Sequence, residues 1–199
     1  MVQIPDFDAL YRDDPDPWRV GSSFYEQRKL AIVLASLTQP RYAYAWDPGC
    51  GTGELAARLV ERSERVLATD ASVEAVRLAT ARCRELPSVE VGRLRQPGEP
   101  RGTGGSFDLM VLAEFAYYLS VSDRTDLWRT VDRAASATAE IVLVHWRHRP
   151  HDGFLSGRDV NDEAVRALTG RASTTGPWSA LVHHDDRDFV LDVVRREAS

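Results

Sequence analysis

Residues 46–54, with the sequence WDPGCGTGE, carry the clearest signal for ligand chemistry. Three glycines at alternate positions let the backbone turn tightly and come close to a ligand. The helix expected after them directs the positive end of its dipole at that ligand. A dinucleotide-binding turn needs Gly-x-Gly-x-x-Gly or Ala, but the sixth position from Gly49 is Glu54, whose carboxylate would face the pyrophosphate. The segment therefore predicts a cofactor site and disfavours a nicotinamide dinucleotide.

The same segment resembles the first motif of class I S-adenosylmethionine-dependent methyltransferases. The matching pattern is Asp-x-Gly-x-Gly-x-Gly, from Asp47 to Gly53. The resemblance implies that the glycine turn cradles the methionine part of S-adenosylmethionine and that Asp47 reaches its amino group. It also implies that the chain has the Rossmann-like fold of that family.

Asp70 adds to this resemblance, because it closes the next apolar run, 65–69, where the family carries an acid for the ribose hydroxyls. A carboxylate offers two acceptor oxygens to two neighbouring hydroxyl donors. Alternatively, Asp70 only caps the helix that begins near Ser72. The chain departs from the family at 92–94, where Gly-Arg-Leu replaces the acid that often meets adenine, so Leu94 is expected to pack on the adenine ring.

Four other segments resemble the nodulation protein S-like N-methyltransferases. They are DPW at 16–18, FYEQRK at 24–29, EFAYYL at 114–119 and HWRH at 145–148. Members of that family methylate the free amine of a deacetylated amino sugar at the end of a chitooligosaccharide. The resemblance covers nearly the whole chain, implies a small-molecule amine as methyl acceptor, and puts Glu114 beside the reactive methyl group.

Residues of the N-terminal part suit such a cofactor. The sulfonium of S-adenosylmethionine is a cation, which the aromatic faces of Trp18, Tyr25 or Tyr117 could stabilise. Arg28 could pair with the methionine carboxylate. Alternatively, Trp18 and Phe24 pack in the core and Arg28 is a surface charge. The residues expected to bind the cofactor are Trp18, Tyr25, Arg28, Asp47, Gly49, Cys50, Gly51, Gly53, Asp70, Ala71, Leu94 and Glu114.

Three residues are expected to be catalytic, namely Glu114, His145 and Tyr117. An alkyl amine with a pKa of about 10 must lose a proton before or during attack on a methyl group. Glu114 or His145 could accept this proton directly or through water. His145 closes a strand at the edge where open parallel sheets bind ligands, although it could equally be a hydrogen-bonded structural histidine.

Two other functions stay open. In an O-methyltransferase of a small natural product, His145 would be the base that accepts the hydroxyl proton. Alternatively, the chain is a non-catalytic subunit that binds S-adenosylmethionine, an interpretation that the altered 92–94 corner keeps open.

Strands and helices alternate along the chain, which predicts an α/β fold with a mainly parallel sheet and helices on both faces. Strands are expected at 42–46, 65–69, 89–91, 107–113, 141–146, 179–184 and 189–194, the last two as an antiparallel hairpin. Helices are expected from Ser22 or Ser23 to near Pro40 and at 55–60, 73–86, 123–137 and 159–168. In the first helix, the residues expected to share the packed face are Phe24, Arg28, Ala31, Ile32 and Ala35.

The chain of 199 residues is expected to form one methyltransferase domain, with a helical arm or lid at 1–41 and a seven-stranded cofactor-binding core at 42–199. Its net charge of −5 disfavours nucleic acid as a partner, because phosphate binding needs a basic face. Its apolar runs are too short for a bilayer, and residues 1–8 lack a basic export signal. We therefore expect a cytoplasmic monomer or homodimer acting on a small molecule.

Neither cysteines nor histidines predict a metal site. Cys50 and Cys83 are expected to be reduced and packed. The acidic and histidine-rich segment 183–186 invites a metal interpretation. Neighbouring strand residues point to opposite faces, so this pair of histidines cannot chelate one ion from a regular strand.

Overall fold

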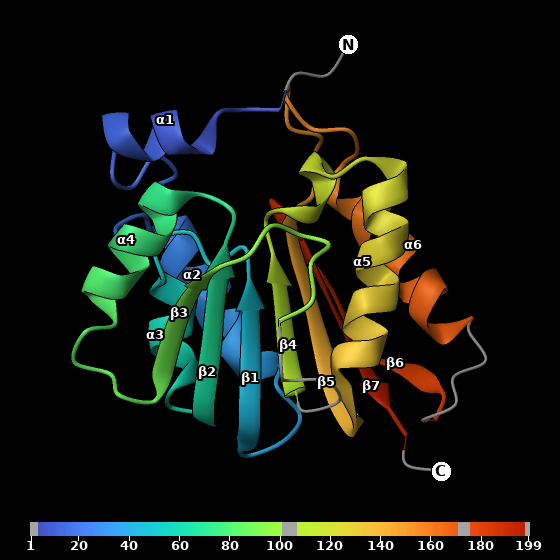
Figure 1. Ribbon diagram of the computed structural model, residues 1–199. Helices are drawn as coiled ribbons and strands as arrows, with labels where there is room; N and C mark the ends of the chain where they lie inside the picture. Colours follow the sequence, from blue (N-terminus) through green and yellow to red (C-terminus); the bar gives the residue numbers. More distant parts are fainter. Residues whose placement is uncertain (1–3, 101–106, 171–175, 198–199) are drawn as a thin grey trace.

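The computed structural model describes residues 4–100, 107–170 and 176–197, which form a seven-stranded sheet flanked by helices (Figure 1). The strands are β1 (Tyr42–Pro48), β2 (Ser63–Asp70), β3 (Val89–Arg93), β4 (Phe107–Ala113), β5 (Ala135–Trp146), β6 (Trp178–Asp185) and β7 (Phe189–Arg196). Their order is β3-β2-β1-β4-β5-β7-β6. Strand β7 is antiparallel to β5 and β6, and the other neighbours are parallel. The predicted sheet and its C-terminal hairpin are confirmed.

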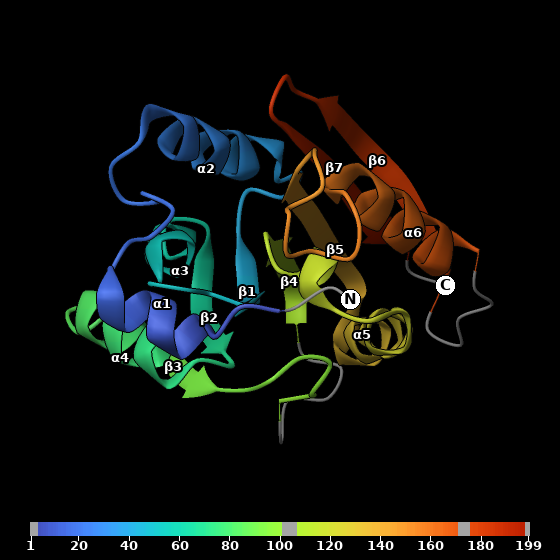
Figure 2. The same cartoon turned by 90° about the horizontal axis from the view of Figure 1, so that it is seen from above.

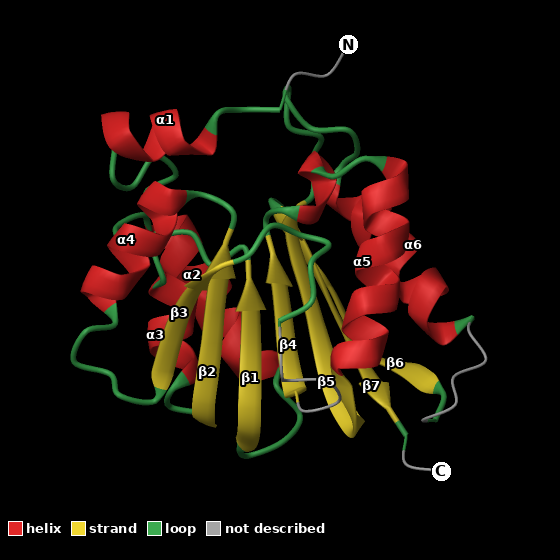
Figure 3. Ribbon diagram, viewed as in Figure 1, coloured by secondary structure: helices red, strands yellow, loops and turns green. Residues whose placement is uncertain are grey.

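Helices cover both faces of this sheet. They are α1 (Phe7–Asp13), α2 (Phe24–Ser36), α3 (Glu54–Leu59), α4 (Val73–Arg82), α5 (Val121–Ala134), α6 (Gly157–Thr169) and the 3₁₀ turn η1 (Ala116–Tyr118). One buried apolar cluster joins α2, α3 and α4 to the sheet, and another joins α5 and α6 to its opposite face (Figure 2). Strands β1, β2 and β4 end at the same edge, and α1 lies beyond that edge (Figure 3).

The boundary between α5 and β5 differs from the prediction. The helix ends at Ala134 and the strand begins at Ala135, so residues 135–137 are strand rather than helix. The small residues at 135–137 allow either a helix or a strand. Pairing of Ala135 with Phe107 of β4 stabilises the strand. The Arg196 guanidinium also donates to the Ala135 and Ser136 carbonyls. Of the glycine- and proline-rich segment at 92–106, residues 101–106 lie outside the described residues.

The packed face of α2 also differs from the prediction. Phe24 is 82% exposed and Ala31 is exposed, so the expected face points largely toward solvent. The buried residues of the helix are Glu26, Lys29, Leu30 and Val33. A hydrophobic pattern misses this face because two of its members are charged, and their charges are satisfied inside the protein.

The start of α6 lies so close to the end of β5 that only glycine fits at position 157. A Cβ atom on Gly157 would lie 2.7 Å from the Cβ of His145, and still closer to the carbonyl oxygen of Trp146. We expect Gly157→Ala to lower the free energy of unfolding by about 1–3 kcal/mol through overpacking, measured by urea denaturation. Gly92→Ala is the control, because no atom of the described residues lies within 4 Å of its added Cβ, its chain neighbours aside. Equal stability of the two variants would contradict this expectation.

Candidate active site

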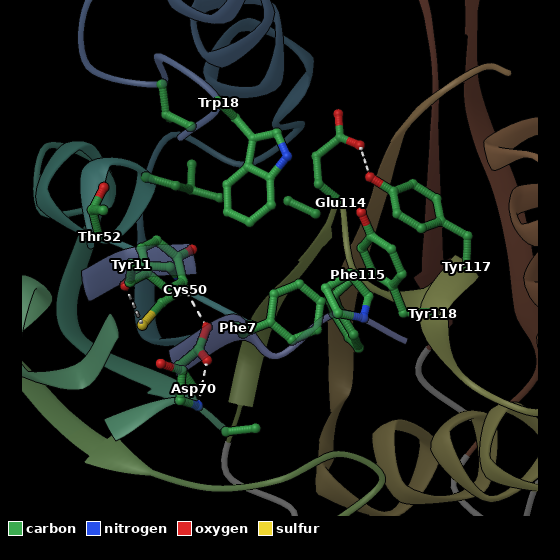
Figure 4. Close-up of a pocket in the computed structure, with 18 of the residues that line it drawn as sticks. Phe7, Tyr11, Trp18, Cys50, Thr52, Asp70, Glu114, Phe115, Tyr117 and Tyr118 are labelled. Carbon is green, nitrogen blue, oxygen red and sulfur yellow. Dashed lines mark hydrogen bonds between the residues drawn. The ribbon is translucent and has the colours of Figure 1, made fainter. Parts of the chain in front are cut away.

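A cavity of about 1180 Å³ opens at the carboxyl edge of the sheet, between the strand ends and the N-terminal arm (Figure 4). The predicted site residues that line it are Trp18, Tyr25, Asp47, Gly49, Cys50, Gly51, Asp70, Ala71, Leu94, Glu114 and Tyr117. Three predicted residues, Arg28, Gly53 and His145, are not among its lining residues. Residues from β1, β2 and β4 and from the arm thus meet around one space.

The glycine turn after β1 has the backbone conformation that its sequence suggests. Gly49, Gly51 and Gly53 have φ angles of 75°, 53° and 77°, in the left-handed region that favours glycine. A Cβ atom on Gly51 would lie 2.8 Å from the Tyr11 hydroxyl. Gly53 instead packs against Ala79 of α4, where an added Cβ would be 3.1 Å from the Ala79 Cα. Gly49 and Gly51 therefore face the cavity, whereas Gly53 lets two helices approach each other.

Asp70 lies directly beside this turn at the end of β2. Its Oδ2 accepts a hydrogen bond from the Gly51 amide at 3.0 Å, and its Oδ1 accepts one from the Ser72 amide at 2.8 Å. Burial raises the pKa of Asp70 against the effect of these hydrogen bonds. The N-cap of α4 is Ser72, whose hydroxyl accepts from the Ala75 amide. Each Asp70 oxygen keeps acceptor capacity for a hydroxyl donor.

Asp47 is the least compensated acid of the cavity. It is buried, and its Oδ2 has no hydrogen-bond partner among the described residues. Burial, followed by the nearby charge of Asp70, raises the pKa of Asp47 to about 8. A buried carboxylate without a partner is unfavourable, so a cationic hydrogen-bond donor placed here would relieve it.

Glu114, directly after β4, is held on both oxygens. Its Oε2 accepts from the Tyr117 hydroxyl at 2.7 Å and from the Trp146 amide at 2.8 Å, and its Oε1 forms an ion pair with Lys29. Its φ of 60° is unusual for a residue other than glycine. Burial is the largest single influence and raises the pKa of Glu114, but the charge of Lys29 and the hydrogen bonds from Lys29 and the Trp146 amide, among other causes, together outweigh it, so the pKa is lowered. The side chain is therefore an ionised carboxylate in a fixed place.

Lys29, which the sequence interpretation missed, occupies the place expected for its neighbour Arg28. The Arg28 guanidinium is part-exposed and pairs with Asp186 in the turn between β6 and β7, which fits the alternative of a surface charge. Lys29 lines the cavity and is the single lysine of the chain. A single lysine among many arginines is the feature of the sequence that could have drawn attention to Lys29.

His145 lies behind Tyr117 and is fully buried. Its ring meets the Tyr117 ring edge-on at 5.4 Å between centroids. Its Nδ1 lies 2.8 Å from Oδ1 of Asn161, whose amide nitrogen donates to Asp192 and so points the oxygen at the histidine. Burial lowers the pKa of His145. This arrangement suits a neutral structural histidine better than a base in contact with an acceptor.

The N-terminal arm closes the cavity from above. Asp8 of α1 accepts hydrogen bonds from the Ser72 hydroxyl at 2.6 Å and the Glu74 amide at 3.2 Å, which ties α1 to the start of α4. Tyr11, another cavity residue that the sequence interpretation missed, packs edge-on against Trp18 at 5.6 Å. Trp18 is 42% exposed and Phe24 is more exposed still. Neither belongs to the core, so the core-packing alternative is wrong for both.

The segment 183–186 makes contacts of other kinds. His183 lies 2.7 Å from Asp192, His184 stacks on Phe189, and Asp185 pairs with Arg158. Among the described residues, no three His, Cys, Asp or Glu side chains gather in a way that could hold a metal ion. No helix in the described ranges is long and apolar enough to cross a membrane.

A sequence model of the nodulation protein S family matches residues 8–140. The chain belongs to the nodulation protein S family. Nodulation protein S from Sinorhizobium fredii is 29% identical over 124 residues, which are 60% of this chain and 56% of that relative. The protein of the same name from Bradyrhizobium diazoefficiens is 32% identical over 108 residues, which are 52% and 49% of the two chains. The chain thus spans about half the length of the curated relatives it matches.

Solved structures share the fold over most of the chain. A protein from Pseudomonas syringae, titled a methyltransferase, has 34% identity and a TM-score of 0.72, covering 87% of this chain and all of that one. The N-methyltransferase NodS from Bradyrhizobium japonicum WM9, in complex with S-adenosyl-L-homocysteine, has 18% identity and a TM-score of 0.77, covering 96% and 97%. The predicted class I methyltransferase fold is therefore confirmed.

The buried Asp47 carboxyl, whose Oδ2 has no partner among the described residues, predicts a stability that depends on pH in the ligand-free protein. A carboxyl whose pKa is raised on folding loses stability as pH rises from its unfolded value, near 4, to about 8. Asn cannot ionise, and the loss between pH 5 and pH 8 is about 3.5 kcal/mol. The Tm of Asp47→Asn, measured by calorimetry, should therefore gain on wild type by about 7–14 °C over this range, since each kcal/mol shifts the Tm of a chain of this length by about 2–4 °C. Any constant cost of the buried amide cancels in this difference.

The control is Asp126→Asn, an exposed residue of α5 paired with Arg129. Its Tm difference from wild type should stay flat over the same range. A flat difference for Asp47→Asn as well would show that Asp47 has an ordinary pKa in the folded protein.

Proposed function

We propose that this protein is an S-adenosylmethionine-dependent methyltransferase that acts on the amine of a small molecule, such as an amino sugar. The observation that carries the proposal is the meeting of the glycine turn, Asp70 and Glu114 around one cavity. The match to the nodulation protein S family supports the choice of an amine.

The residues present fit this cofactor. Asp47 suits the ammonium group of the cofactor, because the buried Oδ2 of Asp47 has no hydrogen-bond partner in the part of the chain that the structure describes. Asp70 suits the ribose hydroxyls, while Ala71 and Leu94 supply the neighbouring wall for adenine. When bound, S-adenosylmethionine supplies a methyl group whose carbon an amine lone pair can attack, with the positively charged sulfur as the leaving group.

Glu114 receives the proton that the acceptor releases. Once the amine nitrogen had bonded to the methyl carbon and the sulfur had left with the electrons of the broken bond, Glu114 would hold the proton that the amine gave up. Tyr117 and the Trp146 amide fix one oxygen of Glu114, so it is oriented before the acceptor arrives. The aromatic arm around Trp18 and Tyr11 excludes water from this step.

An amine suits the cavity better than a hydroxyl. Glu114 is ionised, because its pKa is lowered, so it attracts an acceptor that carries an ammonium group. The base required by the O-methyltransferase alternative, His145, is buried behind Tyr117 and is not among the lining residues. The third alternative, a non-catalytic subunit, predicts binding of the cofactor without turnover.

Cofactor binding is tested by titrating the protein with S-adenosylhomocysteine in a calorimeter. We expect a saturable heat in wild type and an affinity about 10–100-fold lower in Asp70→Asn, since hydrogen bonds to a charged acceptor contribute about 1.5–3 kcal/mol. Asp126→Asn, which is outside the cavity, should bind as wild type does. Absence of binding at high micromolar ligand would overturn the cofactor assignment.

Turnover is tested with a chitooligosaccharide whose terminal sugar is deacetylated and with its fully acetylated counterpart. Mass spectrometry should show a methyl group added to the free amine alone. Glu114→Gln should lower kcat by about 10²–10⁴-fold, because it removes the proton acceptor, while changing S-adenosylhomocysteine affinity by less than about tenfold. Methylation of the acetylated sugar would favour the O-methyltransferase, and binding without turnover would favour the subunit.

A further inference from the structure

A buried lysine between one buried and one half-buried glutamate forms the inner wall of the cavity. Lys29 is 3% exposed and Glu26 is 8% exposed, and both come from α2. The Lys29 ammonium forms ion pairs with Glu26 at 2.9 Å and with Glu114 across the cavity wall. It also lies 4.9 Å from the centre of the Tyr25 ring. Lysine is rarely buried unless it is paired, so this arrangement fixes α2 against the loop after β4.

The three donors to Glu114 come from three different parts of the chain. Lys29 reaches one oxygen from α2, while the Tyr117 hydroxyl from η1 and the amide of Trp146, the last residue of β5, reach the other. Figure 4 shows the carboxylate turned to the Tyr117 hydroxyl, with Trp18 nearby. Loss of Lys29 would remove the positive charge and the hydrogen bond to Oε1, whereas the two hydrogen bonds to Oε2 do not involve Lys29.

Glu26 has the opposite effect on Glu114. It shares the same ammonium and adds a second negative charge nearby, so one lysine serves two carboxylates. Burial raises the pKa of Glu26, against the attraction of Lys29. The cluster of Lys29, Glu26 and Glu114 therefore carries one net negative charge when all three are ionised.

We propose that Lys29 and Glu26 are positioning residues for the methyl-transfer step, with Lys29 holding Glu114 ionised and in place, and Glu26 limiting that hold so that Glu114 can still take a proton. This inference rests on the proposed function of Glu114. It extends the site to α2, a helix of the N-terminal arm.

Other groups around Glu114 set the baseline. The tyrosines Tyr25, Tyr117 and Tyr118 stay neutral, since burial raises the pKa of each. Burial lowers the pKa of His145, and the charge of His145 lowers the pKa of Glu114 less than the charge of Lys29 does. Among the described neighbours, Asp16 adds a more distant negative charge near Glu26. Lys29 is thus the positive charge whose removal should move the titration of Glu114 most.

The direct test is a carbon NMR titration of the Glu114 carboxyl in full-length protein loaded with S-adenosylhomocysteine, with the signal assigned by its loss in Glu114→Gln. Lys29→Met should raise the midpoint by about 1–3 pH units, the range expected for loss of an adjacent opposite charge. Lys29→Arg keeps the charge and should stay close to wild type. Lys29→Met/Glu26→Gln should lie between Lys29→Met and wild type, because the second charge is also gone.

The double variant also serves if Lys29→Met fails to fold, because it removes one charge of each sign. A midpoint unchanged from wild type in the double variant and in every folded Lys29→Met sample would overturn the proposal.

Kinetics provide the second readout. In the pH profile of kcat, the midpoint of the limb at low pH should move to higher pH in Lys29→Met and to lower pH in Glu26→Gln. The KM for the acceptor should change little. Loss of packing alone would not move the low-pH limbs of the two variants in opposite directions. If the low-pH limbs of both variants have the same midpoint as wild type, the positioning role is refuted. If the variants show the expected NMR shifts but the wild-type protein methylates no acceptor, the proposed function is refuted, whereas control of the Glu114 titration by Lys29 still stands.

Discussion

Three carboxyl groups brought together at the carboxyl edge of the sheet, where burial disfavours their charged forms, are the constraint on which the site depends. Asp47, Asp70 and Glu114 lie at the ends of β1, β2 and β4, so the parallel strands bring three carboxylates to one cavity. Backbone amides satisfy Asp70, Lys29 satisfies Glu114, and Oδ2 of Asp47 has no partner among the described residues. Because isolated buried carboxylates are unfavourable, the cavity favours a cationic ligand, which the proposed cofactor is.

The N-terminal arm supplies what the core lacks. Lys29 comes from α2, and Tyr11 of α1 lies against Gly51 of the glycine turn. Asp8 links α1 to the first turn of α4, where a carboxylate also interacts favourably with the helix dipole. The arm therefore both covers the cavity and completes its charge balance, so displacement of the arm would expose Glu114 without its cation.

Sequence alone predicted the parts of the site that local backbone geometry determines. Three glycines in five residues strongly favour a tight turn, and an acid at the end of a parallel strand lies at the carboxyl edge of the sheet. The face of α2 could not be predicted in this way, because Lys29 and Arg28 differ by one position, or about 100° around the helix. The ion pairs with Glu26 and Glu114 decide that Lys29, and not Arg28, points into the protein. Glu114 is distant from Lys29 in the sequence, so a local pattern does not reveal this pair.

Stability does not explain why charged groups occupy that helix face. Buried ion pairs are often replaceable by apolar residues of similar volume with no loss of stability, whereas removal of one partner is strongly destabilising. An apolar residue at position 29 beside another at 26 would complete the face that Leu30 and Val33 begin. Glu114 would then stand beside the acceptor without a cation, and burial would favour its protonated form. A protonated Glu114 cannot receive a proton from an amine, so the charges on α2 follow from the chemistry proposed for the cavity.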